Sequence, residues 1–188
     1  MSSDTDARKR YIALATVHFS ERGFNGASLA QIAEQAGVSK QALLHFFKSK
    51  EQLYESVLEA LAARLLRKVQ DTKSDKPDKW LSDYFDQFSA DAMSDPVDAR
   101  LVLRALLDSQ AGARRWPLKA YLDALVAIAE RTRRWNDAPV DELLADLYYT
   151  IGAVLCAAVS LTALQGMYGS NAVRHFSRRH LGLVAAAL

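Results

Sequence analysis

Cysteine is almost absent from this 188-residue chain, which contains only Cys156. A single cysteine forms neither an internal disulfide nor a zinc site of several thiolates, so we expect a protein of a reducing compartment, the cytoplasm. The first residues are polar and acidic, which does not fit a secretory signal. Motifs for a phosphate loop, a dinucleotide site or a catalytic nucleophile are missing, and the four histidines are not spaced as metal ligands. We therefore expect no enzyme, no cofactor and no metal.

Glycine and proline are also scarce, at 8 and 4 residues, whereas alanine and leucine dominate nearly every segment. Such a composition favours helix and predicts an all-α fold. Each proline precedes an apolar helical pattern, as expected where its missing N–H is harmless in a first turn. The apolar periodicity predicts about nine helices, over residues 5–22, 28–37, 39–47, 50–72, 78–92, 96–110, 117–134, 139–167 and 170–188.

The chain as a whole has little excess charge of either sign, with 24 Lys and Arg against 22 Asp and Glu. The distribution is uneven, however, because residues 1–50 carry 7 basic and 4 acidic side chains. We therefore expect a polyanionic partner to meet the N-terminal part of the chain.

Residues 28–47 have the spacing of a helix-turn-helix, with two short helices joined by a tight turn at Gly37. Ser28 and Gln31 form a capping-box pattern for the first helix, and Ser39 is the expected cap of the second. On spacing alone, the polar face of the second helix fits DNA binding and an ordinary solvated surface equally well. The residues of this face are Lys40, Gln41, Leu44, His45 and Lys48.

The longer segment from Arg10 to Leu53 resembles the TetR/AcrR family of bacterial transcriptional regulators. The resemblance is carried by the stretch FSERGFNGASLAQIAEQAGVSKQALLHFFKSKEQL. It contains the motifs Phe-x-x-x-Gly-Phe, Ile-Ala-x-x-Ala-Gly-Val-Ser and Phe-x-Ser-Lys-Glu-x-Leu. The resemblance covers about a quarter of the chain. It implies a three-helix DNA-binding head with a helix-turn-helix, residues 1–50, followed by a helical ligand-binding and dimerisation body, residues 51–188.

The resemblance also implies roles for particular residues in DNA binding. Ser28 and Lys50 are expected to hold phosphates, and Lys40 and Gln41 to approach base edges. The full set of expected DNA-binding residues is Ser28, Ser39, Lys40, Gln41, Leu44, His45, Lys48 and Lys50.

Three positions depart from the family pattern. Leu44 stands where Tyr is usual, so we expect His45 to take over part of a phosphate contact, while Leu44 contacts a thymine methyl or a sugar. Phe46, where Tyr or His is frequent, is expected to face the core, and Lys48 replaces a frequent Pro with a cation for the DNA backbone. For the basic run at residues 8–10, a solvated helix start and a minor-groove or phosphate contact stay equally open.

The second part of the chain holds all three Trp and several Tyr and Phe, most of which fit an ordinary core. Arg104 interrupts an apolar run, and it is expected either to pair with Asp108 or a helix end, or to anchor an anionic ligand. The resemblance implies a cavity for a small effector, lined by Phe85, Phe88, Leu103, Arg104, Leu107, Tyr121, Leu125 and Tyr148.

No charged residue occurs between Leu147 and Val173, a stretch long enough to cross a bilayer. The glycines and polar residues within it favour a helix buried between its own subunit and a second one. We therefore expect a homodimer rather than a membrane anchor. The expected interface consists of Leu155, Ala158, Val159, Thr162, Leu181 and Val184.

Together these features predict a ligand-responsive transcriptional regulator. We expect a repressor that binds a near-palindromic, double-stranded DNA operator as a dimer and is released by a small-molecule effector. Two alternatives stay open. One is an activator or ligand-independent DNA binder, and the other is a helical small-molecule-binding or enzymatic protein whose helix-turn-helix is incidental.

Overall fold

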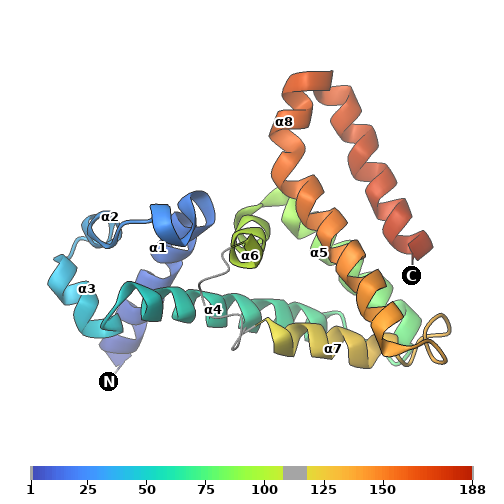
Figure 1. Ribbon diagram of the computed structural model, residues 1–188, viewed down its shortest axis with the longest axis horizontal. Helices are drawn as coiled ribbons and strands as arrows, with labels where there is room; N and C mark the ends of the chain where they lie inside the picture. Colours follow the sequence, from blue (N-terminus) through green and yellow to red (C-terminus); the bar gives the residue numbers. More distant parts are fainter. Residues whose placement is uncertain (1, 108–117, 188) are drawn as a thin grey trace. The chain divides into compact units, whose positions relative to one another are not determined.

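The computed structural model describes residues 2–107 and 118–187, and the side chains of residues 4–107 and 118–171. Every regular element within these ranges is a helix, which confirms the predicted all-α class. Figure 1 shows the helices in chain order. Their bounds are α1 Ser2–Gly26, α2 Leu29–Gln35, α3 Lys40–Phe47, α4 Lys50–Asp71, α5 Pro77–Ser94, α6 Val97–Leu107, α7 Lys119–Ala129 and α8 Val140–Ala187.

Two glycines interrupt long helices near the places where helix ends were predicted. Gly23 has φ 69° and ψ 179° inside α1, and Gly169 has φ 80° and ψ 165° inside α8. Glycine adopts a positive φ without steric penalty, so the chain bends at these points. Because α8 contains the two final helices that were predicted separately, the prediction of about nine helices is close to what the described residues show.

Helix α7 ends at Ala129, earlier than the predicted end at residue 134. Both the backbone N–H and the hydroxyl of Thr132 donate to the carbonyl of Ala129, at 2.9 and 2.6 Å. These bonds replace the next helical turn, and residues 130–137 form tight turns instead. The predicted start of this helix and the predicted end of the helix at 96–110 lie outside the described residues.

The chain divides into two compact units. The head unit comprises Met1–Ala63 and Arg100–Leu118, and the body unit comprises Arg64–Ala99 and Lys119–Leu188. The chain therefore passes between the units within α4, within α6 and again after Leu118. The functional division at residue 50 stays a prediction.

Apolar side chains of the first four helices form the core of the head unit. Phe19 of α1, Ile32 of α2 and Leu43 of α3 are fully buried. The ring of Phe19 packs on those of Tyr54 and Phe24, with centroids 4.8 and 6.3 Å apart. This burial fixes α2 and α3 on α1 and on the first turns of α4.

In the body unit α5 and α8 lie side by side (Figure 1). The hydroxyl groups of Tyr84 on α5 and Tyr121 on α7 lie 2.6 Å apart, and both side chains are buried. Burial raises the pKa of both phenols, because a phenolate there would lose its hydration. Both groups are therefore neutral at physiological pH and form part of the core.

The stretch Val140–Asn171 of α8 is long and apolar enough to cross a membrane, with a mean hydropathy of 1.8. One side of the helix is packed within the body unit, where Leu143, Leu147 and Val154 are at most 2% exposed. Tyr149, on another side of the helix, is 74% exposed, and no residue from 161 to 171 is buried, with Tyr168 71% exposed. A helix with one buried side is typical of a folded domain, and this supports burial over a bilayer span.

Candidate nucleic-acid interface

Helices α2 and α3 are joined by a tight turn around Gly37, which has φ 71°. The N–H of Val38 donates to the carbonyl of Ala33 at 3.0 Å, and the N–H of Gly37 donates to that of Glu34 at 3.0 Å. At α3 the hydroxyl of Ser39 accepts from the N–H of Ala42 at 3.1 Å, which is the predicted cap. The backbone of α3 is thereby held in a fixed register on α2.

The capping box predicted for α2 is wrong. Ser28 occupies the N-cap position with extended backbone, but its hydroxyl makes no cap bond. Gln31 accepts instead from the guanidinium of Arg22 on α1, which removes it from Ser28. The hydroxyl of Ser28 therefore has no partner among the described residues, and its role as a phosphate ligand stays a prediction.

The polar face of α3 is exposed, and most of its side chains have no internal partner among the described residues. Lys40, Gln41, His45 and Lys48 are exposed, whereas Leu44 between them is half-buried. Within the described residues, no hydrogen bond or ion pair engages the side chains of Lys40, Gln41 or Lys48. Ammonium and amide groups in this state can bind phosphates and the acceptor edges of bases without breaking an internal contact.

Lys48 follows α3 with φ 57°, a positive value that residues other than glycine rarely adopt. Its N–H donates to the carbonyl of Leu44 at 2.7 Å, which closes the last turn of α3. The left-handed backbone costs about 1 kcal/mol in a residue with a side chain. Lysine is thus less stable than glycine at this turn, but it supplies an exposed ammonium group that glycine does not have.

The end of α3 adjoins the first turns of α1. The ring of Phe46 packs on Tyr11, with centroids 5.1 Å apart, in agreement with the expectation that Phe46 faces inward. Beside this contact is a hollow of about 390 Å³, lined by Asp4, Thr5, Arg8, His45 and Phe46. No motif marks Thr5 or Asp4, so the sequence alone did not connect them with α3.

Lys50 sits at the end of α1 rather than in open solvent. Its Nζ lies 4.8 Å from the ring centroid of Phe24 and 3.5 Å from the carbonyl oxygen of Asn25. The cation–π contact and the helix carbonyl both favour a cation at this place. The phosphate contact expected of Lys50 stays a prediction.

The basic run at residues 8–10 lies within α1, which begins at Ser2. The guanidinium of Arg8 donates to the hydroxyl of Ser56 at 2.9 Å, and that of Arg10 donates to the carbonyl of Ala36 at 3.2 Å. Two of the three cations are therefore engaged within the head unit. An extended arm in a minor groove would need these residues to leave the helix, so the structure favours the helical interpretation.

The residues expected to line an effector cavity fall in both units. Leu103, Arg104 and Leu107 belong to the head unit, and the other five belong to the body unit. Of those five, Phe85, Phe88, Tyr121 and Leu125 are buried in the core of the body unit.

Arg104 is engaged with the end of α1. Its Nε donates to the carbonyl of Ser20 at 2.8 Å, and its Nη2 donates to the carbonyl of Glu21. A Cβ placed at Gly23 would lie 3.2 Å from Nη1 of Arg104, so glycine also leaves room for this guanidinium. The bonds match the expected contact with a helix end and favour it over the alternative of an anchor for an anionic ligand, because donors of Arg104 already satisfy helix carbonyls.

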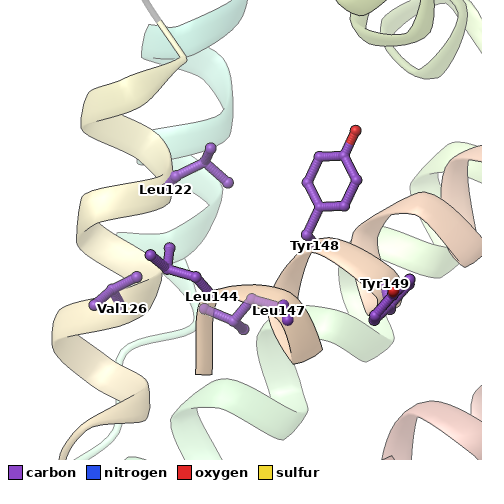
Figure 2. Close-up of a pocket in the computed structure, with 7 residues that line it drawn as sticks. Leu122, Val126, Leu144, Leu147, Tyr148 and Tyr149 are labelled. Carbon is purple, nitrogen blue, oxygen red and sulfur yellow. The ribbon is translucent and has the colours of Figure 1, made fainter. Parts of the chain in front are cut away.

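The body unit has a hollow of about 370 Å³ between α7 and α8. Figure 2 shows Leu122 and Val126 of α7 directed toward Leu144 of α8, with the ring of Tyr148 extending away from α8 beside them. Of the residues expected to bind an effector, Tyr148 lines this hollow. The lining residues are Leu122, Val126, Leu144, Ala145, Leu147, Tyr148 and Tyr149.

The residues expected at a dimer interface differ in exposure. Leu155 and Ala158 are 1% and 5% exposed, so their own subunit already covers them, and a second subunit cannot bury them further. Val159 is half-buried and Thr162 is exposed, and these two remain available. The side chains of Leu181 and Val184 lie outside the described residues.

This geometry defines a helix-turn-helix of the DNA-binding type, with a polar second helix exposed on a buried support. Residues 12–57 match the family model of bacterial regulatory proteins, tetR family. The match falls on the helix-turn-helix and confirms the resemblance to the TetR family that the chain's motifs indicated.

Relatives of known name match the same part of the chain. RutR of Escherichia coli K12, an HTH-type transcriptional regulator, is 52% identical over 58 residues, 30% of this chain and 27% of RutR. KstR2 of Mycolicibacterium smegmatis, an HTH-type transcriptional repressor, is 39% identical over 57 residues, 30% of this chain and 28% of KstR2. The matched segment spans little more than a quarter of either relative.

Solved structures resemble the chain over nearly its whole length. HlyIIR, a hemolysin II transcriptional regulator, superposes with a TM-score of 0.63 at 19% identity, covering 94% of this chain and 97% of that one. A TetR-like transcriptional regulator from Rhodococcus sp. RHA1 has a TM-score of 0.65 at 16% identity, covering 94% and 96%. A protein solved for the control of antibiotic production by bacterial hormones has a TM-score of 0.69 at 19% identity, covering 97% of both chains. The body unit therefore shares the fold of such regulators.

Proposed function

We propose that the protein is a ligand-responsive transcriptional repressor that binds a near-palindromic operator as a homodimer and is not an enzyme. The observation that carries DNA binding is the exposed polar face of α3, whose Lys40, Gln41 and Lys48 have no internal partner among the described residues. Lysine suits the acceptors of guanine and the phosphates, and glutamine suits adenine. The turn at Gly37 presents these groups on a rigid support, which favours specific over nonspecific contacts.

A dimer gives this short helix enough reach. α3 spans only Lys40–Phe47, so one copy touches few base pairs. Two copies related by a two-fold axis reach successive major grooves about 34–36 Å apart, and the operator is then a near-palindrome. The stretch of α8 from Leu147 onward carries no charge as far as Val173, and Val159 is only half-buried there and Thr162 exposed, which supports an interface with a second chain.

Repression and effector release complete the proposal. The name of KstR2 describes a repressor, which supports repression. The structurally similar protein solved for the control of antibiotic production by bacterial hormones supports a response to a small molecule. An effector that favours one arrangement of the dimer lowers DNA affinity by linkage. Helices α4 and α6 each run from one unit into the other, so they connect effector binding in the body unit with DNA binding in the head unit. The site of action is the cytoplasm.

Selection of binding sites from random duplex DNA tests the proposal. We expect recovered sequences to contain two inverted half-sites whose centres are about one helical turn apart. Sedimentation of the free protein should give a dimer, and a reporter gene with the selected site at its promoter should be silenced. Recovery of no consensus, or binding by a monomer to a single half-site, contradicts the proposal.

A further inference from the structure

Among the residues whose side chains the structure describes, those that line the hollow between α7 and α8 carry no charge (Figure 2). Five of the seven are aliphatic, and the other two are Tyr148 and Tyr149. The polar groups that these side chains offer are the two phenol hydroxyls. The chemistry of the lining therefore suits an apolar molecule with a group that can form a hydrogen bond.

The hollow is large enough for a small molecule and is not filled by the chain itself. Its volume of about 370 Å³ lies within the range of small-molecule pockets, roughly 300–1,000 Å³. Leu144 is 43% exposed and Tyr148 is 56% exposed, so much of the apolar lining faces water. Covering that surface with a ligand gives a favourable hydrophobic contribution to binding.

Lys119 and Arg134 on the flanking turns are paired with carboxylates, whereas Arg131 has no ion pair among the described residues but does not line the hollow. Nζ of Lys119, one turn before Leu122, lies 2.7 Å from Asp123, and Nη2 of Arg134 lies 3.1 Å from Asp146. Arg104 belongs to the head unit and donates to the carbonyls at the end of α1. An anionic ligand in this hollow would therefore lose its hydration without gaining a counter-ion from the lining.

We propose that the hollow between α7 and α8 binds a neutral, mainly apolar small molecule whose hydrogen-bonding group meets the hydroxyl of Tyr148 or Tyr149. This inference rests on the proposed function, in which the bound molecule is the effector. It replaces the anionic effector expected from Arg104. A second copy of the chain could cover the same apolar surface, and the experiment below separates the two occupants.

Two fluorescent probes that differ by one charged group test the ligand class. N-phenyl-naphthylamine is neutral, and anilinonaphthalene sulfonate adds a sulfonate to the same ring system. Titrated against the full chain, the neutral probe should bind about tenfold or more tightly than the sulfonate, because a buried unpaired charge is strongly unfavourable. Equal affinity, or tighter binding of the sulfonate, overturns the proposal.

A matched pair of variants locates the probe. Ala145 lines the hollow and Ala127 does not, although both are exposed alanines on the two helices concerned. Ala145→Trp fills the hollow and should lower affinity for the neutral probe about tenfold or more, whereas Ala127→Trp should leave it unchanged. Equal binding by both variants shows that the probe sits elsewhere and overturns the proposal.

The same variants show whether a ligand or a second copy of the chain covers the hollow. They also show whether the ligand site or the proposed function is wrong. If a second chain covers the hollow, probe affinity falls as protein concentration rises and Ala145→Trp alters sedimentation, which overturns the ligand site. DNA binding is measured independently with a duplex selected as above. A parent protein that binds the neutral probe but no specific DNA would refute the proposed function and leave the ligand class standing.

Discussion

The head and body units differ in how well their functional sites can be predicted from residues that are neighbours in the sequence. In the head unit one turn, around Gly37, positions a polar helix, and the residues that do so are neighbours in the chain. In the body unit the hollow is formed by Leu122 and Leu144, which come from separate helices and belong to no motif. Local constraints therefore make the DNA-binding site recognisable from sequence, whereas a pocket formed by packing is visible only in three dimensions.

The largest expected effect distinguishes a buried position of the body unit from an exposed one. Ala158→Glu places a charge where the side chain is 5% exposed within its own subunit, and this should lower the free energy of unfolding by several kcal/mol, about 3 or more. Ala120→Glu, at an exposed position of α7 outside the proposed dimer interface, should change it by less than about 0.5 kcal/mol. Urea denaturation followed by circular dichroism measures both.

The result also bears on the dimer. If Ala158 were at a subunit interface instead of in the subunit core, its glutamate variant would dissociate into folded monomers. Sedimentation of a folded monomer would therefore contradict the burial of this side of α8 within one chain.

The next prediction concerns specificity in the head unit. Gln41→Ala removes an exposed amide from α3 and should reduce discrimination at one base pair by about 1–3 kcal/mol, with little effect on folding. Competition binding with single-base variants of the selected operator measures this loss. Gln35→Ala, an exposed glutamine on α2 outside the polar face of α3, is the control. Equal discrimination by Gln41→Ala and the parent would remove Gln41 from the base contacts.

Arg104 shows where sequence-based inference and structure part. A charged residue in an apolar run suggested either a contact with Asp108 or a helix end, or a ligand anchor. The helix end that it meets, at Ser20 and Glu21, is about eighty residues away in the chain. No local pattern reveals that partner. By contrast, the cap at Ser39 was predictable because its acceptor and donor are three residues apart. The fold class and most helix bounds were likewise predictable, since they depend on local composition and periodicity.

Replacing Arg104 sharpens this contrast. Arg104→Met keeps the apolar stem but leaves two helix carbonyls without their donor, and it should destabilise the protein by about 1.5–3 kcal/mol. Arg67→Met, at an exposed position with no partner among the described residues, should have almost no effect. Thermal unfolding compares them. Equal stability of the two variants would indicate that the contacts of Arg104 do not stabilise the head unit.

The smallest effect is expected at the end of α3. Lys48→Gly removes a side chain from a residue with positive φ and should stabilise the protein by about 1 kcal/mol. Because the cation is lost, the variant should also bind every DNA sequence more weakly, by about the same factor. Lys48→Gln, which keeps a long side chain but not the charge, should lower the affinity for DNA without the gain in stability. A loss of stability in the glycine variant would contradict the strained backbone at this turn.

The claim that α3 binds DNA is tested most directly by fluorescence anisotropy with a selected operator. The triple variant Lys40→Ala, Gln41→Ala, His45→Ala alters only exposed side chains, so its unfolding curve should match that of the parent. Its operator affinity should fall about a hundredfold or more, because contacts to both bases and phosphates are removed. A folded triple variant that binds the operator as tightly as the parent would show that another surface recognises DNA.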